Sequence, residues 1–261
     1  MLAHIDSLIV FLGSIAIFGY GMYRTVFQGK LPHIRRLPAL EAVDEGIGIA
    51  LETGKKVHVG LPGIDLVGLT AAQSLVSFSI LGYVARKAAE AGVPAVYTTG
   101  VPAAYPIMDG VIHDAYAEAG KLDMYENPEM VQIRVAASGG AGDDVYPYFY
   151  ANFLARENVG FSLVTGLVGK PMLFIGETNQ AEGIFSILAY PIVDKIEWGV
   201  PTFDYTMFML ETYTAGAWIT KDKIQLGSVV GTDIWVWIFI AAVVVGTIIA
   251  SILGSPLPIG G

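Results

Sequence analysis

The chain has 261 residues, no cysteine and a formal charge of −9, and 54% of its residues are hydrophobic against 15% charged. The low charged fraction is typical of chains with membrane segments, since soluble proteins carry about 25% charged residues. The lack of cysteine excludes disulfides, thiolate metal sites and cysteine nucleophiles. The acidic balance argues against a nucleic-acid partner, because phosphate neutralisation needs clustered Lys and Arg.

Two uncharged apolar runs, one near each terminus, predict transmembrane helices. Residues 7–23 and 234–254 contain no charged side chain, and about 20 apolar residues cross a bilayer core. A cleaved signal peptide is the alternative for the first run, but that run lacks a basic start and a small-residue cleavage site. The predicted parts are a tail over 1–6, a helix over 7–27, a domain over 28–228, a helix over 229–254 and a tail over 255–261.

Basic residues flank both runs on the side of the central domain. We call them the basic collar and expect them to contact lipid headgroups: Arg24, Lys30, Arg35, Arg36, Lys221 and Lys223. Lys and Arg gather on the cytoplasmic side of membranes, and neither outer tail has one. We therefore expect a multi-pass protein of the inner (cytoplasmic) membrane, with the domain in the cytoplasm and both termini outside.

A stripe of small residues marks one face of the second apolar run. Ala242, Gly246, Ala250 and Gly254 recur every four residues, and small residues let membrane helices approach closely. The stripe predicts a helix-packing face, which could meet the first helix or another copy of the chain.

Between the runs, short apolar segments alternate with helical ones. This pattern predicts βαβ units and a mainly parallel sheet with flanking helices, a Rossmann-like three-layer α/β fold. The predicted strands are 56–60, 95–99, 131–136, 160–165, 184–188 and about 198–200. The predicted helices are 38–53, 70–91, 103–119, 144–156 and 204–219. Residues 168–181 fit a helix or a strand, and we favour a helix.

The loops after the strands supply the candidate binding residues, because open parallel sheets bind ligands there. Their glycines could approach a phosphate, but neither GxGxxG nor GxxxxGK[ST] is present and an acidic pair at 143–144 would repel an anion. Carboxylates could gather for Mg²⁺ or acid–base chemistry, although Asp144 and Asp204 are better interpreted as helix caps. The candidate ligand-binding residues are Gly63, Asp65, Thr98, Thr99, Ser138, Gly139, Gly140, Asp143, Glu177 and Asn179.

Catalytic and metal-binding signatures are weak. The four histidines lack HxH or HExxH spacing, and His58 inside a strand is expected to be a hydrogen-bonded sheet residue. Residues 177–180 (ETNQ) are interpreted as a polar turn. We therefore predict no catalytic residue, no metal and no cofactor.

Five segments, taken in order, resemble a prokaryotic family of membrane proteins known as domain of unknown function 6754. They are RRLPALEAVDEGIGIALETGKKVHVGLPG, SILGYVARKAAEAG, VIHDAYAEAGKLDMY, FIGETNQAEG and FDYTMFMLETYTAGAW. The resemblance covers about residues 34–245. It implies an α/β domain beside membrane helices and supplies no activity or site.

The predicted function follows from the anchors and from the missing signatures. The apolar runs contain no Asp, Glu, Lys, Arg or His, which argues against a transporter. We expect a membrane-anchored, oligomeric scaffold or partner-docking protein whose partners are the bilayer and further copies or other membrane proteins. The alternatives are small-molecule or nucleotide binding or sensing, which could be enzymatic, at the carboxyl edge of the sheet, and an accessory subunit of a larger membrane complex.

Overall fold

The chain divides into two units, one of residues 1–34 with 221–261 and one of residues 35–220. We describe each unit by itself. The structure is a computed structural model, and it describes residues 5–32, 36–67, 71–136, 145–169, 171–192 and 194–253.

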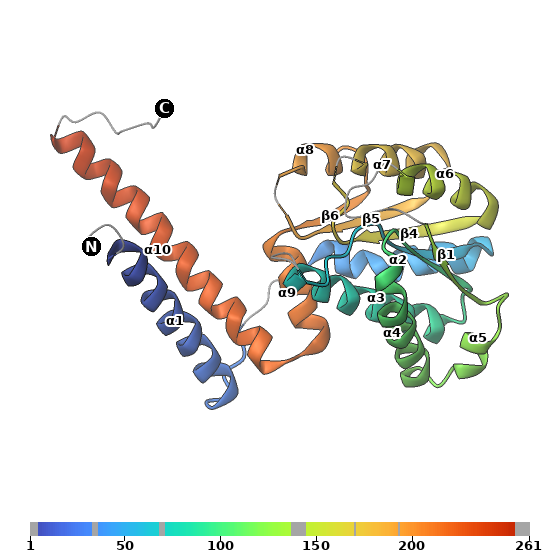
Figure 1. Cartoon of the computed structure of the whole chain (residues 1–261), viewed down its shortest axis with the longest axis horizontal. Coiled ribbons are helices and arrows are strands. Elements are labelled where there is room, and N and C mark those ends of the chain that lie inside the picture. The colour runs from blue at the N-terminus through green and yellow to red at the C-terminus, as the bar shows by residue number, and fades with distance from the viewer. Residues whose placement is uncertain are drawn as a thin grey trace. The chain divides into compact units, whose positions relative to one another are not determined.

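A parallel sheet forms the centre of the unit of residues 35–220 (Figure 1). Its described strands lie in the order β3-β2-β1-β4-β5-β6, and every neighbouring pair is parallel. This confirms the predicted parallel sheet. The strands are β1 (Lys56–Leu61), β2 (Ala95–Thr99), β3 (Val131–Val135), β4 (Val159–Thr165), β5 (Phe185–Tyr190) and β6 (Tyr205–Phe208).

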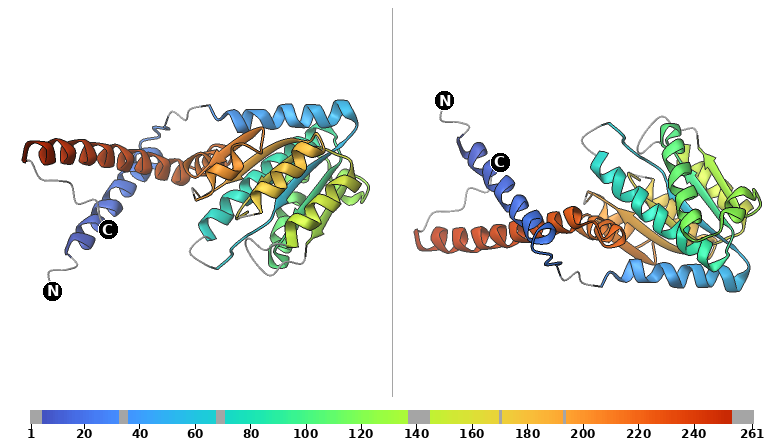
Figure 2. Two further views of the ribbon diagram at one scale, coloured as in Figure 1. Left: turned by 90° about the horizontal axis from the view of Figure 1, so that it is seen from above. Right: turned by 90° about the horizontal axis from the view of Figure 1, so that it is seen from below.

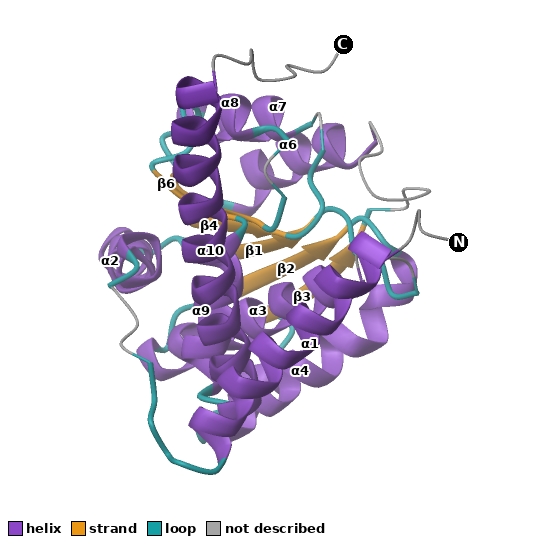
Figure 3. Cartoon of the chain, turned by 90° about the vertical axis from the view of Figure 1, so that its left-hand side faces the viewer, coloured by secondary structure: helices purple, strands orange, loops and turns teal. Residues whose placement is uncertain are grey.

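Helices cover both faces of the sheet (Figures 1 and 3). α2, α3, α4 and α9 lie on one face, and α6, α7 and α8 lie on the other. This arrangement confirms the three-layer α/β fold. The helices are α2 (Pro38–Thr53), α3 (Ala71–Ala91), the 3-10 turn η2 (Pro102–Ala104), α4 (Tyr105–Glu118), α5 (Leu122–Glu126), α6 (Val145–Glu157), α7 (Met172–Ala181), α8 (Ile196–Gly199) and α9 (Leu210–Thr220).

The central strands are buried along their whole length. All residues of β2 and β4 are buried, which is why neither segment alternates regularly between apolar and polar residues. The two faces differ in chemistry. The face under α2, α3 and α4 is packed with Val, Leu, Ala and aromatic side chains, whereas the face under α6 and α7 also carries polar groups such as His58 and Ser162.

Helix α2 shows how the sequence sets an element and its packing. Pro38 stands at its start, and Gly54 ends it with a left-handed φ of 65°, a conformation that favours glycine. Gly46 faces the sheet, and a Cβ there would lie 2.4 Å from the Phe161 ring. The helix therefore approaches β4 only because residue 46 has no side chain.

The last third of the domain differs from the prediction. The predicted strand at 198–200 is wrong, because Ile196–Gly199 form the short helix α8. The edge strand is instead β6, and helix α9 begins at Leu210 rather than at residue 204. Asp204 is not a helix cap, since its carboxylate accepts hydrogen bonds from the backbone N–H and the hydroxyl of Ser186 at 2.8 and 3.0 Å. Residues 168–181 contain helix α7, as favoured.

The second unit pairs α1 (Ile5–Val26) with α10 (Lys223–Leu253). Among the described residues one helical segment, Lys223–Ser251, is long and apolar enough to cross a membrane. The expectation of a second such helix near the N-terminus is not met, because the apolar part of α1, Val10–Val26, is shorter.

Glycines bring α1 and α10 into contact. A Cβ on Gly21 would lie 2.3 Å from Gly227 O, and one on Gly231 would lie 2.5 Å from the Phe18 ring. The Thr25 hydroxyl donates to Lys223 O at 2.8 Å. The helices are closest where α1 ends and α10 begins, and they diverge from there (Figure 2). The predicted stripe is not this contact: a Cβ on Gly246 would meet no described atom within 4 Å, and Gly254 lies outside the described residues.

Two glycines of α2 provide a test of this packing. Gly46→Ala is expected to lower the free energy of unfolding by about 1–3 kcal/mol, because the new methyl overlaps a buried ring. Gly48→Ala, where a Cβ meets no described atom within 4 Å, is expected to raise it by about 0.5–1 kcal/mol through the lower entropy of the unfolded chain. Denaturant titrations of both full-length variants, followed by circular dichroism, measure the difference. Equal effects would contradict the packing described for α2.

Candidate functional site

The strand order places a topological switch point between β1 and β4. The chain leaves β1 for α3 on one face of the sheet and leaves β4 for α7 on the other. Connections that diverge in this way open a crevice outside the carboxyl ends of the two strands, where open α/β sheets bind their ligands. We take this carboxyl edge as the candidate site.

The two loops at the switch point are joined by backbone contacts. The Leu167 N–H donates to Gly63 O at 2.8 Å. Gly166 has a φ of +107°, and a Cβ on it would lie 2.6 Å from Gly63 O. Glycine at 166 is therefore required for both the backbone conformation and the close approach. The result is a fixed floor at the centre of the carboxyl edge.

Short polar side chains hold the neighbouring loops. The Asp65 carboxylate accepts from the Val67 N–H at 3.2 Å, while the Asp65 N–H donates to the Ser74 hydroxyl at 2.9 Å. These bonds tie the β1–α3 loop to the first turn of α3. The Thr99 hydroxyl at the end of β2 likewise accepts from the Val101 N–H at 3.1 Å.

Thr165, the last residue of β4, is different. Its side chain is fully buried, yet its hydroxyl has no hydrogen-bond partner among the described residues. Burying an unpaired hydroxyl costs about 1–3 kcal/mol. A buried polar group without a partner, at the switch point of a parallel sheet, is the feature of this edge that most needs an explanation.

The strand order and its switch point establish a fold rather than an activity. Comparison with protein families is more direct, because the family described as Domain of unknown function (DUF6754) matches residues 2–257. The chain belongs to this family. The resemblance noted in the sequence is thereby confirmed, and it supplies no reaction. No curated protein and no solved structure matches the chain.

A row of buried polar groups lies under α6 and α7 in this DUF6754 protein. It crosses three neighbouring strands, with Thr98 on β2, His58 on β1 and Ser162 on β4, and it is completed by helix residues. We call this set the polar row: Tyr146, Thr98, His58, Ser162, Tyr150 and Asn179. Each member is at most 2% exposed. Gly60 makes room for it, because a Cβ there would lie 2.5 Å from the Tyr146 hydroxyl.

The direction of every hydrogen bond in the polar row follows from Asn179. Its Oδ1 accepts from the Tyr150 hydroxyl at 2.7 Å, so the single Tyr150 proton is committed and Ser162 must donate to Tyr150, also at 2.7 Å. Ser162 Oγ then accepts from His58 Nδ1–H at 2.8 Å.

The other half of the polar row continues from the imidazole. His58 Nε2, which carries no proton in this tautomer, accepts from the Thr98 hydroxyl at 2.8 Å. The oxygen of Thr98 accepts from the Tyr146 hydroxyl at 2.6 Å. His58 is therefore the neutral Nδ1–H tautomer, with both ring nitrogens bonded, as expected for a sheet residue rather than a ligand.

Burial sets the charge of this row. It lowers the pKa of His58 to about 3, and it raises the pKa values of the Tyr146 and Tyr150 hydroxyls above their usual range. All members are neutral at physiological pH, and a neutral hydrogen-bonded row can be buried without an unpaired charge. Because its members are buried and hydrogen-bonded to one another, the polar row is a structural element that joins β1, β2 and β4 to α6 and α7.

The predicted candidate residues divide into three groups. Gly63, Asp65 and Thr99 lie at the carboxyl edge, and Thr98 lies just below it in the polar row. Glu177 and Asn179 are in helix α7 rather than in the predicted polar turn; Glu177 is exposed and Asn179 is buried. The remaining four lie outside the described residues: Ser138, Gly139, Gly140 and Asp143.

The carboxylate cluster is not assembled by the described residues. Asp65 follows the carboxyl end of β1, whereas Asp204 precedes β6 at the opposite edge of the sheet. Within the described ranges, no three His, Asp or Glu side chains come close enough together to hold a metal ion. Glu177 is exposed on α7, and Asp143 and Asp144 are outside those ranges.

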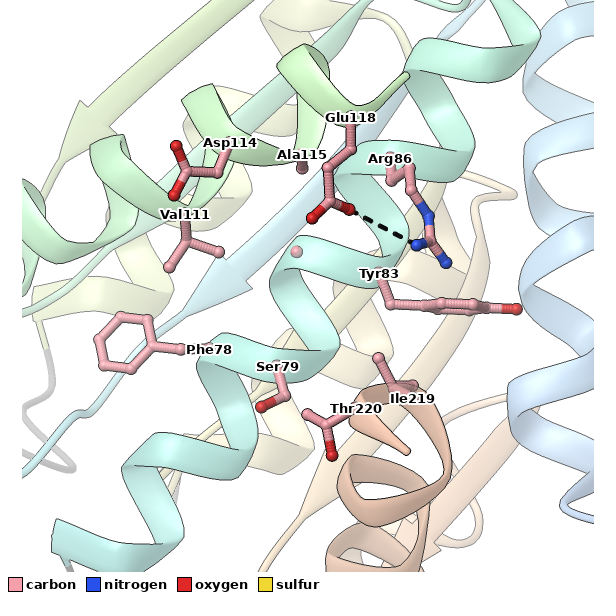
Figure 4. Close-up of a pocket in the computed structure, with 11 residues that line it drawn as sticks. Phe78, Ser79, Tyr83, Arg86, Val111, Asp114, Ala115, Glu118, Ile219 and Thr220 are labelled. Atoms are coloured by element: carbon pink, nitrogen blue, oxygen red, sulfur yellow. Dashed lines mark ion pairs between the residues drawn. The ribbon is translucent and has the colours of Figure 1, made fainter. Parts of the chain in front are cut away.

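A separate hollow of about 460 Å³ lies between α3, α4 and the end of α9 (Figure 4). Arg86 on α3 is paired there with Glu118 on α4 at 3.6 Å, and also with Glu90 at 3.7 Å. Sequence reasoning missed this hollow because its lining comes from three helices that are far apart in the sequence. Its cation is already paired with two carboxylates, so the hollow is a weaker candidate than the switch point.

The buried imidazole predicts a specific pH dependence. The pKa of His58 is about 3 when folded and about 6.5 when unfolded, so the unfolded chain binds more protons between these values. The neutral imidazole therefore makes its full contribution to the unfolding free energy above about pH 6.5, and this contribution is lost as the pH falls towards 3. Between pH 6 and 4 the unfolding free energy of the wild type should fall more steeply than that of His58→Gln, by about 1.4 kcal/mol per pH unit.

Denaturant titrations at several pH values measure these slopes, and ¹⁵N-histidine NMR of the full chain at pH 5 checks the tautomer. Parallel slopes, or a protonated His58 at pH 5, would show that the imidazole is not buried in the polar row.

Proposed function

We propose that this chain is a membrane-anchored protein that binds a small molecule at the carboxyl edge of its sheet, between β1 and β4. The observation that carries the proposal is the buried Thr165 hydroxyl at the switch point, which has no described partner. A ligand that accepts from or donates to this hydroxyl would remove the desolvation cost. The rigid glycine contact between residues 63 and 166 supports a preformed floor for such a ligand.

The anchor is proposed to be the α1–α10 pair, which makes the protein two-pass. α10 has the required length and composition. α1 has 22 residues, and its apolar part, Val10–Val26, is about 26 Å long at 1.5 Å per residue, so the proposal requires local thinning of the bilayer around it. Its glycine contact with α10 supports an antiparallel pair of membrane helices. The basic collar supports an orientation with the α/β domain in the cytoplasm and both termini outside the inner membrane.

Replacing the unpaired hydroxyl tests the ligand proposal. Thr165→Val keeps the shape of the side chain, so the ligand-free protein should be as stable as the wild type or more stable by about 1 kcal/mol. Native mass spectrometry of full-length protein, released from membranes in mild detergent, should find a small-molecule adduct on the wild type and less of it on Thr165→Val. The absence of any adduct on the wild type, or a loss of more than about 1 kcal/mol in the variant, would contradict the proposal.

A second candidate function, an oligomeric scaffold, is favoured by the small-residue stripe. α1 packs near Gly227 and Gly231, whereas a Cβ on Gly246 of the stripe would meet no described atom within 4 Å. Since small residues promote helix association in membranes, we propose that Ala242, Gly246 and Ala250 meet another copy of the chain. The same helix face could instead bind another membrane protein, which would make the chain a partner-docking protein or an accessory subunit of a larger complex.

Substitutions on α10 separate the two helix contacts. Gly246→Val should shift the full-length protein from oligomer to monomer in native mass spectrometry, because the added side chain prevents close backbone approach. Gly227→Val should instead disturb the α1–α10 pair and leave the oligomer interface in place. A wild-type protein that is monomeric in mild detergent, with no accompanying protein, would exclude the scaffold function.

A further inference from the structure

The exposed apolar side chains of the α/β unit gather at one edge. Sixteen large hydrophobic residues between 35 and 220 are exposed among those described. Thirteen of them lie within five residues of the carboxyl end of a strand or the start of the helix that follows it. The three elsewhere are Leu51, Leu122 and Trp218. We call the thirteen the apolar rim. Large exposed apolar groups concentrated in one region of a surface indicate a binding site.

The apolar rim lies on both sides of the switch point. On the α6/α7 side, the rings of Tyr148 and Phe174 are 5.6 Å apart, and the two side chains are 65% and 40% exposed. On the α3/α4 side, Val67 is 96% exposed and Tyr105 is 39% exposed. The candidate site is therefore flanked by apolar groups on both faces of the sheet.

Four of the helix starts at this edge are uncharged, whereas α8 and α9 have Glu197 and Glu211 in their first turns. The first turns of α3, α4, α6 and α7 read AAQS, YPIM, VYPY and MLFI. A nucleotide site would be expected to present Gly, Ser, Thr or Lys to its phosphates here. Lys195, after β5, is paired with Asp194. Lys170 lies outside the described residues.

The buried polar group without a described partner at this edge is neutral. Thr165 contributes a hydroxyl that can make one hydrogen bond to an uncharged oxygen. Apolar walls with a few placed polar groups are typical of sites for lipid-like molecules. An anchor in the bilayer would keep such a site close to a supply of these molecules.

We propose that the ligand at the carboxyl edge is a long-chain lipid with an uncharged oxygen-bearing headgroup, such as a hydroxyl or carbonyl, rather than a nucleotide. Its chain lies along the apolar rim, and its oxygen bonds to the Thr165 hydroxyl. This inference rests on the proposed function, because it names the class of molecule taken by the same site.

Photolabelling tests the proposal. The full chain in nanodiscs is irradiated with a diazirine-bearing hexadecanol, and the labelled peptides are mapped by mass spectrometry. Label is expected on the peptides that contain Val145–Tyr148 and Leu173–Phe174, and a tenfold excess of plain hexadecanol should reduce it at least threefold. Label on α10 provides the reference for contact with bulk lipid, which competition does not remove.

Matched variants locate the label. Phe174→Ser should lower labelling of the rim peptides at least threefold, whereas Leu122→Ser, which changes a residue with the same 40% exposure away from the apolar rim, should not. Rim label that resists competition would mean that the edge meets the bilayer in general, and it would overturn the proposal of a bound lipid. An unlabelled rim would overturn it as well.

A binding experiment with nucleotides distinguishes failure of the lipid proposal from failure of the proposed small-molecule function. ATP and NAD⁺ are added at millimolar concentration to the same nanodiscs, and binding is measured by equilibrium dialysis. Binding of either one that is lost in Thr165→Val would leave the proposed site standing and overturn the lipid class. If neither the nucleotides nor the lipid binds, both the lipid class and the small-molecule function fail.

Discussion

The hydrogen bonds between His58 and its two strand neighbours are the constraint on which one half of the domain depends. A parallel sheet is buried on both faces, so each polar side chain on it must find a partner inside the protein. His58 finds Thr98 and Ser162 at 2.8 Å on either side. Those hydroxyls in turn need Tyr146 and Tyr150, and both tyrosines come from α6. The position of α6 on the sheet is thus specified by hydrogen bonds as well as by apolar contact.

The parts of the fold that the sequence predicts are those with a strong local pattern. Short segments rich in apolar residues and bounded by turn signals identified five of the six strands. The edge strand β6 was assigned to a helix, since its four residues, YTMF, are too few to show a pattern. Asp204 was misinterpreted for a related reason. A carboxylate before a helical segment resembles a cap, and its bond to Ser186 joins residues 18 positions apart.

The candidate site was predictable in position but not in chemistry. Loops after parallel strands follow from the βαβ pattern, and Gly63, Asp65 and Thr99 were found in this way. Thr165 was missed because nothing in its neighbourhood distinguishes it from any other strand residue; its lack of a partner appears only in three dimensions. The helix contact of Gly21 with Gly227 was missed because glycine spacing within one helix does not show which face the other helix meets.

The polar row has a property that a set of isolated hydrogen bonds would lack. All of its protons point the same way, from Tyr146 towards Asn179. The amide nitrogen of Asn179 is buried without a described partner. A half-turn of that amide would present a donor to Tyr150, and each hydroxyl would then rotate and the imidazole would exchange Nδ1–H for Nε2–H. Apart from the exchanged oxygen and nitrogen of the amide, the heavy atoms would stay in place. The interior of this domain thus permits two opposite electrical polarities within one geometry, and a single side chain selects between them.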